Sequence, residues 1–120
     1  MNREEILERY IVDLSAEKLS LTANMEAVVA AIIAAAKKYK WDICAKGNPN
    51  GAAQCGVDFY ILIEDEYRYL TLHALAYFLL SCAVQMGVPR DAAMNYEYAM
   101  SLYREFARKA HELKPNNHIK

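Results

Sequence analysis

An uncharged stretch from Tyr69 to Pro89 constrains the fold of this chain more than any other feature of the sequence. It is nominally long enough to cross a bilayer. Four polar side chains interrupt it, at Thr71, His73, Ser81 and Gln85. Its apolar strength is that of a central core helix and not of a lipid-facing one. We therefore expect a buried helix here and no membrane partner.

The size and composition of the chain indicate one ordinary globular domain. A chain of 120 residues needs only one hydrophobic core. With 55% hydrophobic and 24% charged residues, it lies far from the composition of disordered proteins and should fold unaided. We expect a single helical domain over residues 1–114. Pro115 stops the last helix, so residues 115–120 should form a frayed tail.

Apolar residues recur at helical spacing in four segments, which predicts four helices. The segments are Arg3 to Leu14, Asn24 to Lys40, Asp65 to Met86, and Pro89 or Arg90 to Leu113. Thr22 or Asn24 can cap the second helix, and Gly87 ends the third. Short connections between such helices favour an all-α domain, either a four-helix antiparallel bundle or a related helical array.

The second of these segments is filled with alanine between its larger apolar residues. Small side chains at Ala27, Ala30, Ala31, Ala34 and Ala35 let another backbone come close. That neighbour is either another helix of the same bundle or a second copy of the chain across a dimer interface.

The segment from Trp41 to Gly56 lacks helical periodicity, and Gly47–Gly51 is a clear turn signal. The flanking runs, Trp41 to Ala45 and Val57 to Ile63, are both compatible with short strands. Short apolar runs do not distinguish helix from strand. A small β-hairpin around residues 41–63 therefore remains an alternative to a long loop followed by a helix.

No catalytic, metal or phosphate-binding motif stands out. The chain contains no Glu-x-x-His pair of the kind that di-iron bundles need. The glycines at 47, 51 and 56 do not match a phosphate loop. Cys55 is the best thiol candidate, but nothing nearby predicts a lowered pKa. We expect no enzyme, no metal site and no cofactor.

Cysteine usage and charge bear on location and partners. The three cysteines, Cys44, Cys55 and Cys82, are an odd number in a chain whose first residues do not resemble a secretory signal. This favours reduced thiols and a cytoplasmic location. Cys44 and Cys55 flank the loop and can pair only under oxidising conditions. Fourteen basic and fifteen acidic residues give a net charge of -1, which disfavours nucleic acid as a partner.

The chain has nine tyrosines, an unusually large number, and most of them lie in its second half. Tyrosine combines a large apolar body with a polar tip, which suits contact surfaces. We expect an interaction surface that includes Tyr67, Tyr69, Tyr98 and Trp41. The leading hypothesis is a non-enzymatic helical protein–protein interaction module, a small regulator, adaptor or inhibitor that self-associates as a homodimer.

Two other hypotheses belong to different functional classes. In the first, a helical bundle binds a small ligand or metal in a pocket formed by His73, Tyr77 and Cys82. In the second, the segment from Gly87 to Arg108 belongs to a helix-turn-helix DNA-binding regulator, because the spacing of Ala83 and Gly87 resembles that motif. The charge balance of the following helix argues against the second hypothesis.

Overall fold

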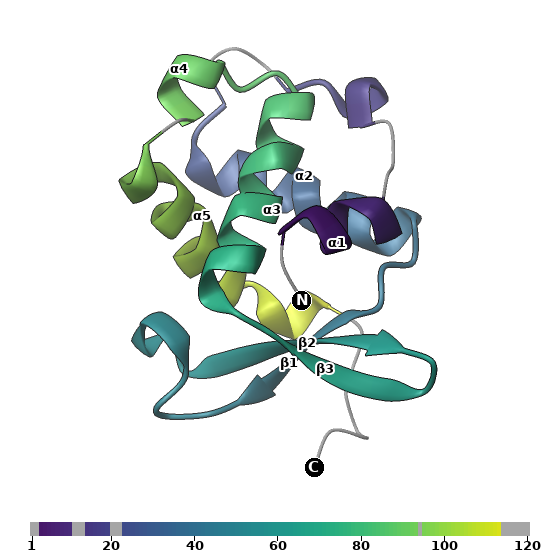
Figure 1. Cartoon of the computed structure of the whole chain (residues 1–120). Coiled ribbons are helices and arrows are strands. Elements are labelled where there is room, and N and C mark those ends of the chain that lie inside the picture. Colours follow the sequence, from purple (N-terminus) through teal and green to yellow (C-terminus); the bar gives the residue numbers. More distant parts are fainter. Residues whose placement is uncertain (1–2, 11–13, 20–22, 94, 114–120) are drawn as a thin grey trace.

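The computed structural model describes residues 3–10, 14–19, 23–93 and 95–113, and it has a mixed α/β fold (Figure 1). Helices α1 to α5 lie on one face of a three-stranded antiparallel sheet. The expected all-α fold, a four-helix bundle or helical array, is therefore wrong. The expected tail over residues 115–120 lies outside the described residues.

The elements follow one another along the chain, with η marking a 3-10 helix. They are α1 Arg3–Arg9, η1 Leu14–Glu17, α2 Met25–Lys38, β1 Ile43–Gly47, η2 Ala52–Gln54, β2 Val57–Ile63, β3 Glu66–Leu70, α3 Leu72–Gln85, α4 Arg90–Ala93, α5 Tyr96–Arg108 and η3 Ala110–Glu112. The second helix was predicted well, since the Asn24 side chain caps α2 by accepting a hydrogen bond from the Ala27 backbone N–H at 2.9 Å.

The sheet has the order β1-β2-β3, with β2 paired to both neighbours. Alternate residues point to opposite faces of a strand. On the helix-covered face Ile43 lies opposite Ile61, and Phe59 lies opposite Leu70. All four side chains are at most 1% exposed. The ring of Phe59 also packs on Tyr103 of α5, with centroids 5.7 Å apart.

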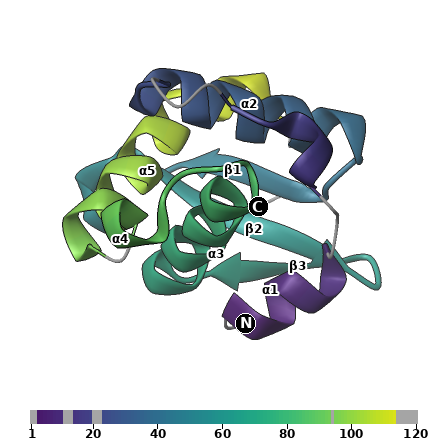
Figure 2. The ribbon, with the colours of Figure 1, turned by 90° about the horizontal axis from the view of Figure 1, so that it is seen from above.

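Helix α3 lies in the middle of the helical layer, with α1 on the β3 side and α2 on the β1 side (Figure 2). Its residues Leu75, Phe78, Leu79 and Ala83 are at most 1% exposed. The uncharged stretch therefore does contain a core helix. Among the described residues, no helix is long and apolar enough to cross a membrane.

The third helix does not begin near Asp65, as its sequence predicted, but at Leu72. Residues Glu66–Leu70 instead form β3, with Tyr67 and Tyr69 on one face of the sheet. Thr71 separates strand from helix, since its Oγ1 accepts a hydrogen bond from the Ala74 backbone N–H at 3.3 Å. This N-cap was overlooked because the apolar run continues through it.

The last predicted helix is divided into α4, η3 and the longer α5 between them. Asn95 begins α5, because its side chain accepts a hydrogen bond from the Glu97 backbone N–H at 2.8 Å. The helix that follows the turn at Gly87 is α4, which has only 4 residues. The first helix is also shorter than predicted and ends at Arg9 instead of Leu14.

A two-residue turn joins β2 to β3, and both of its residues have left-handed backbones. The φ angles of Glu64 and Asp65 are 51° and 64°, as in a type I′ turn, which prefers Asn-Gly. Side chains with a Cβ cost about 1 kcal/mol or more in this region. The backbone conformation of the turn therefore suits a β-hairpin, but glutamate and aspartate are unfavourable residues for it.

We expect the double substitution Glu64→Asn/Asp65→Gly to stabilise the protein by about 1 kcal/mol, because it relieves the backbone cost of the turn. Thermal unfolding should show a rise in Tm of roughly 4 °C. The control Glu64→Gln/Asp65→Ser removes the same two charges without the favourable turn residues. An equal rise in the control would assign the effect to charge instead of backbone conformation.

The longer connection between β1 and β2 is organised by the carboxylate of Asp58. Its Oδ2 accepts a hydrogen bond from Asn48 Nδ2 at 2.7 Å, and its Oδ1 accepts one from the Ala52 backbone N–H at 3.2 Å. Gly51 lies in the tightest part of this loop. A Cβ at Gly51 would lie 2.7 Å from the carbonyl oxygen of Val57, so only glycine fits.

Gly51→Ala should therefore destabilise the fold by about 2 kcal/mol, as overpacked sites commonly do. Gly47→Ala is the matched control, because a Cβ there meets no atom within 4 Å. Urea unfolding of both variants measures the difference. Two equally stable variants would show that the loop opens without cost and does not constrain the hairpin.

Candidate functional site

The sheet face that points away from the helices is the candidate site. Strand alternation places five apolar or aromatic side chains there, which we call the tyrosine face: Cys44, Tyr60, Leu62, Tyr67 and Tyr69. Cys44 is only 5% exposed, and the other four side chains lie outside the main hydrophobic core. Helices α1 to α5 lie on the opposite side of the sheet (Figure 1).

The side chains of the tyrosine face are ordered in rows by the strand register. Tyr60 lies opposite Tyr69, and their rings are 5.7 Å apart and inclined at 67°, a favourable edge-to-face geometry. Leu62 lies opposite Tyr67 in the next row. Tyr69 is 44% exposed, whereas Tyr60, Leu62 and Tyr67 are half-buried, so the two rows present one accessible aromatic ring beside three partly covered side chains.

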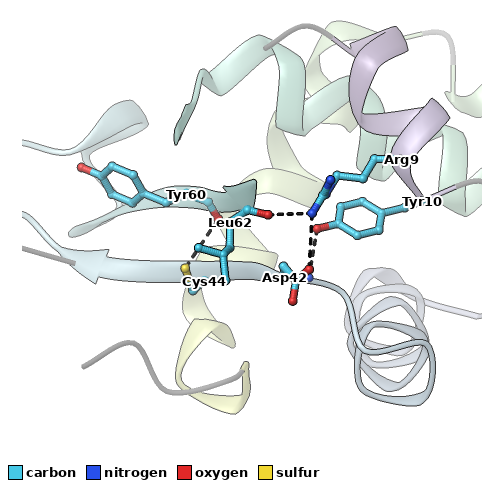
Figure 3. A network of polar contacts seen from close by, with 6 residues as sticks. All are labelled: Arg9, Tyr10, Asp42, Cys44, Tyr60 and Leu62. Atoms are coloured by element: carbon cyan, nitrogen blue, oxygen red, sulfur yellow. Dashed lines mark hydrogen bonds and ion pairs between the residues drawn. The ribbon is translucent and has the colours of Figure 1, made fainter. Parts of the chain in front are cut away.

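Charged groups border this surface. At one end Lys46 lies opposite Asp58 in the register. At the other end Arg9 of α1 donates a hydrogen bond from Nη2 to the Leu62 carbonyl oxygen at 2.7 Å and pairs with Asp42 at 3.6 Å (Figure 3). An apolar centre with a charged border is the usual anatomy of a protein interface.

Two titrating groups on and near the face have raised pKa values. Burial raises the pKa of the Tyr69 phenol, and the Asp58 carboxylate raises it further, so the hydroxyl stays protonated at neutral pH. Burial likewise raises the pKa of the Cys55 thiol, which leaves it a poor nucleophile. Within the described ranges, no group of three His, Cys, Asp or Glu side chains is placed to hold a metal ion.

The structure separates the four residues predicted for an interaction surface. Tyr67 and Tyr69 lie together on the tyrosine face, while Tyr98 is half-buried on α5. Trp41 is only 5% exposed, and its ring packs 5.3 Å from that of Phe78. Sequence reasoning did not place Tyr60 in this surface. Its alternation with Phe59 and Ile61 was the available signal, once that segment is accepted as a strand.

The three residues predicted for a pocket all lie on α3, but their environments differ. His73 is exposed, with its ring 6.1 Å from that of Tyr96. Tyr77 is half-buried one turn later, and Cys82 is 2% exposed within the core. His73 and Cys82 therefore do not face one common space.

All three cysteines are free. The Cys44 thiol lies 3.6 Å from the carbonyl oxygen of Tyr60, to which it donates a hydrogen bond (Figure 3). The Cys55 thiol donates to the carbonyl oxygen of Ala53 at 3.5 Å. Cys44 and Cys55, which flank the loop in sequence, are thus not joined in this structure.

Comparisons with protein-family models, with curated proteins and with solved structures found no match to this chain.

Burial of Cys82 makes stability depend on alkaline pH. Burial raises the pKa of this thiol to about 12, against 9.0 for a free thiol. Above pH 9 the unfolded chain therefore loses a proton that the folded chain keeps. From pH 9 to about pH 12, Cys82 should lower the free energy of unfolding by about 1.4 kcal/mol per pH unit.

Urea unfolding at pH 8, 9 and 10 checks this dependence. Cys82→Ala should be less stable than the parent at pH 8, because it leaves a small cavity. Its stability should fall less steeply from pH 9 to pH 10. Parallel pH profiles for the parent and the variant would contradict the assignment to Cys82.

Proposed function

We propose that the chain is a non-enzymatic protein-interaction module that self-associates through its tyrosine face. The observation that carries the proposal is the continuous surface of Tyr60, Leu62, Tyr67 and Tyr69 on the side of the sheet opposite the helices. Aromatic residues are enriched in interface cores and dominate binding energies there.

A second copy of the chain suits this face for geometric reasons. Two sheets pack face to face at a separation of about 10 Å, with side chains from both filling the space between them. A two-fold axis places the same patch on both sides of the interface. The border carries both signs of charge, including Lys46 and Asp58, so two copies do not repel each other.

Pairing through the sheet edge is less favourable than pairing through the face. Strand β3 is an edge strand, and its other face carries Glu66 and Arg68, both exposed. Charged side chains on an edge strand oppose the addition of further strands. We therefore assign self-association to the face and not to the edge of the sheet.

The alanine-rich helix supports a supplementary contact. Ala27, Ala30 and Ala34 of α2 are exposed, whereas Val29 and Ile32 are buried. The exposed alanines leave a smooth helix surface that a neighbour can approach closely. They carry little apolar area, so the tyrosine face remains the main contact in this proposal.

The proposal includes a role as a small regulator, adaptor or inhibitor in the cytoplasm. Three free thiols, two of them buried, suit a reducing compartment. A net charge of -1 gives no general attraction to nucleic acid. In this role, dimer formation would control access to the tyrosine face.

Tyr69→Lys should weaken the homodimer at least tenfold, a loss typical of a central interface tyrosine. Sedimentation equilibrium over a range of protein concentrations measures the dissociation constant. The matched control is Tyr96→Lys, because Tyr96 is 53% exposed but lies on α5, on the other side of the sheet (Figure 1).

Thermal unfolding of both variants checks that each is folded. A parent that stays monomeric up to about 1 mM, well above the micromolar range of specific complexes, would overturn self-association. Equal weakening by the two substitutions would move the interface away from the tyrosine face.

A further inference from the structure

A groove of about 510 Å³ lies between the end of α2, the start of β1 and the end of η3. Its apolar wall includes Trp41, Ile43 and Leu113, all of which belong to the hydrophobic core. A groove of this size matches a small-molecule site, since such sites are mainly apolar with a few polar groups.

Both acidic residues that line the groove are paired with basic side chains. Asp42 pairs with Arg9 at 3.6 Å, and Glu112 pairs with Lys37 at 3.9 Å. Lys40 also lines the groove, and no partner for its ammonium group is recorded among the described residues. The groove therefore offers one unpaired positive charge beside an apolar wall.

The backbone of Lys40 has an unfavourable, left-handed conformation. Its φ is 54°, and it follows the end of α2, where the Trp41 N–H closes the helix by donating to the Ala36 carbonyl oxygen at 2.9 Å. Glycine is the preferred residue at this helix-ending position. A strained lysine at the rim of a groove points to a use for its side chain.

Trp41 provides a second independent sign of an incomplete site. It is 5% exposed, and its indole Nε1 is buried with no hydrogen-bond partner among the described residues. An unpaired buried donor is costly. An acceptor atom of a ligand that reaches this N–H would remove that cost.

We propose that this groove binds a small aromatic carboxylate, with its ring against Trp41 and Leu113 and its carboxylate paired with Lys40. The single unpaired cation matches one negative charge and not the two of a phosphate monoester. The apolar wall requires a hydrophobic body on the ligand. This inference is independent of self-association through the tyrosine face.

Trp41 is the only tryptophan of the chain, so its fluorescence reports directly on the groove. Titration with phenylacetate should change the emission along a saturable curve. The uncharged analogue phenylacetamide should bind more weakly by up to about fivefold, because it lacks the charge that pairs with Lys40. Added salt should weaken the binding of phenylacetate and leave that of the amide unchanged.

Lys40→Gly separates binding from folding, because the two effects have opposite directions. The variant should bind phenylacetate more weakly by up to about fivefold. It should also unfold roughly 3 °C higher, since glycine suits the left-handed backbone. Lys38→Gln is the control: it removes an equal charge from the same helix end, where Lys38 pairs with Glu17 at 2.6 Å, and it should bind phenylacetate like the parent.

Three results would overturn the proposal. The first is no saturable change in emission with phenylacetate up to about 10 mM, a concentration above the millimolar range of weak complexes. The second is equal affinity of the parent for phenylacetate and phenylacetamide. The third is equal affinity of Lys40→Gly and the parent for phenylacetate.

Discussion

The burial of α3 is the constraint on which the rest of the structure depends. This helix carries no charged residue, and Leu75, Phe78 and Leu79 are at most 1% exposed. Each such side chain contributes roughly 1.5 to 3 kcal/mol when it leaves water. One neighbour cannot cover a helix that is apolar on most sides. Helices α1, α2 and α5 surround it together (Figure 2).

That arrangement also explains why one face of the sheet is not covered by helices. All of helices α1 to α5 are used on one face of the sheet (Figure 1). The strands alternate, so each inward residue such as Phe59 or Ile61 leaves an outward neighbour such as Tyr60 or Leu62. A two-layer domain therefore leaves one sheet face without a helical layer, and here that face is aromatic. Tyrosine suits such a position, because its hydroxyl remains hydrated while its ring can be buried by a partner.

Left-handed backbones occur at several non-glycine residues of the described chain, and three of these residues are charged. Lys40 follows α2, and Glu64 and Asp65 join β2 to β3; all three have left-handed backbones without being glycine. In each case a charged side chain stands where glycine or asparagine would be more stable. At the end of α2 the lysine brings an ammonium group to the groove beside Trp41.

The sequence by itself determined the elements that depend on local interactions. Asn24 and the apolar periodicity after it defined α2, and the uncharged stretch defined a buried helix. The sequence did not determine β3, because Tyr67 and Tyr69 fit a helical extension as well as a strand. Only hydrogen bonding to β2 decided between the two. The tyrosine face and the groove at Trp41 also required the tertiary structure. Each joins residues distant in sequence, such as Ile43 and Leu113, and no local spacing encodes their contact.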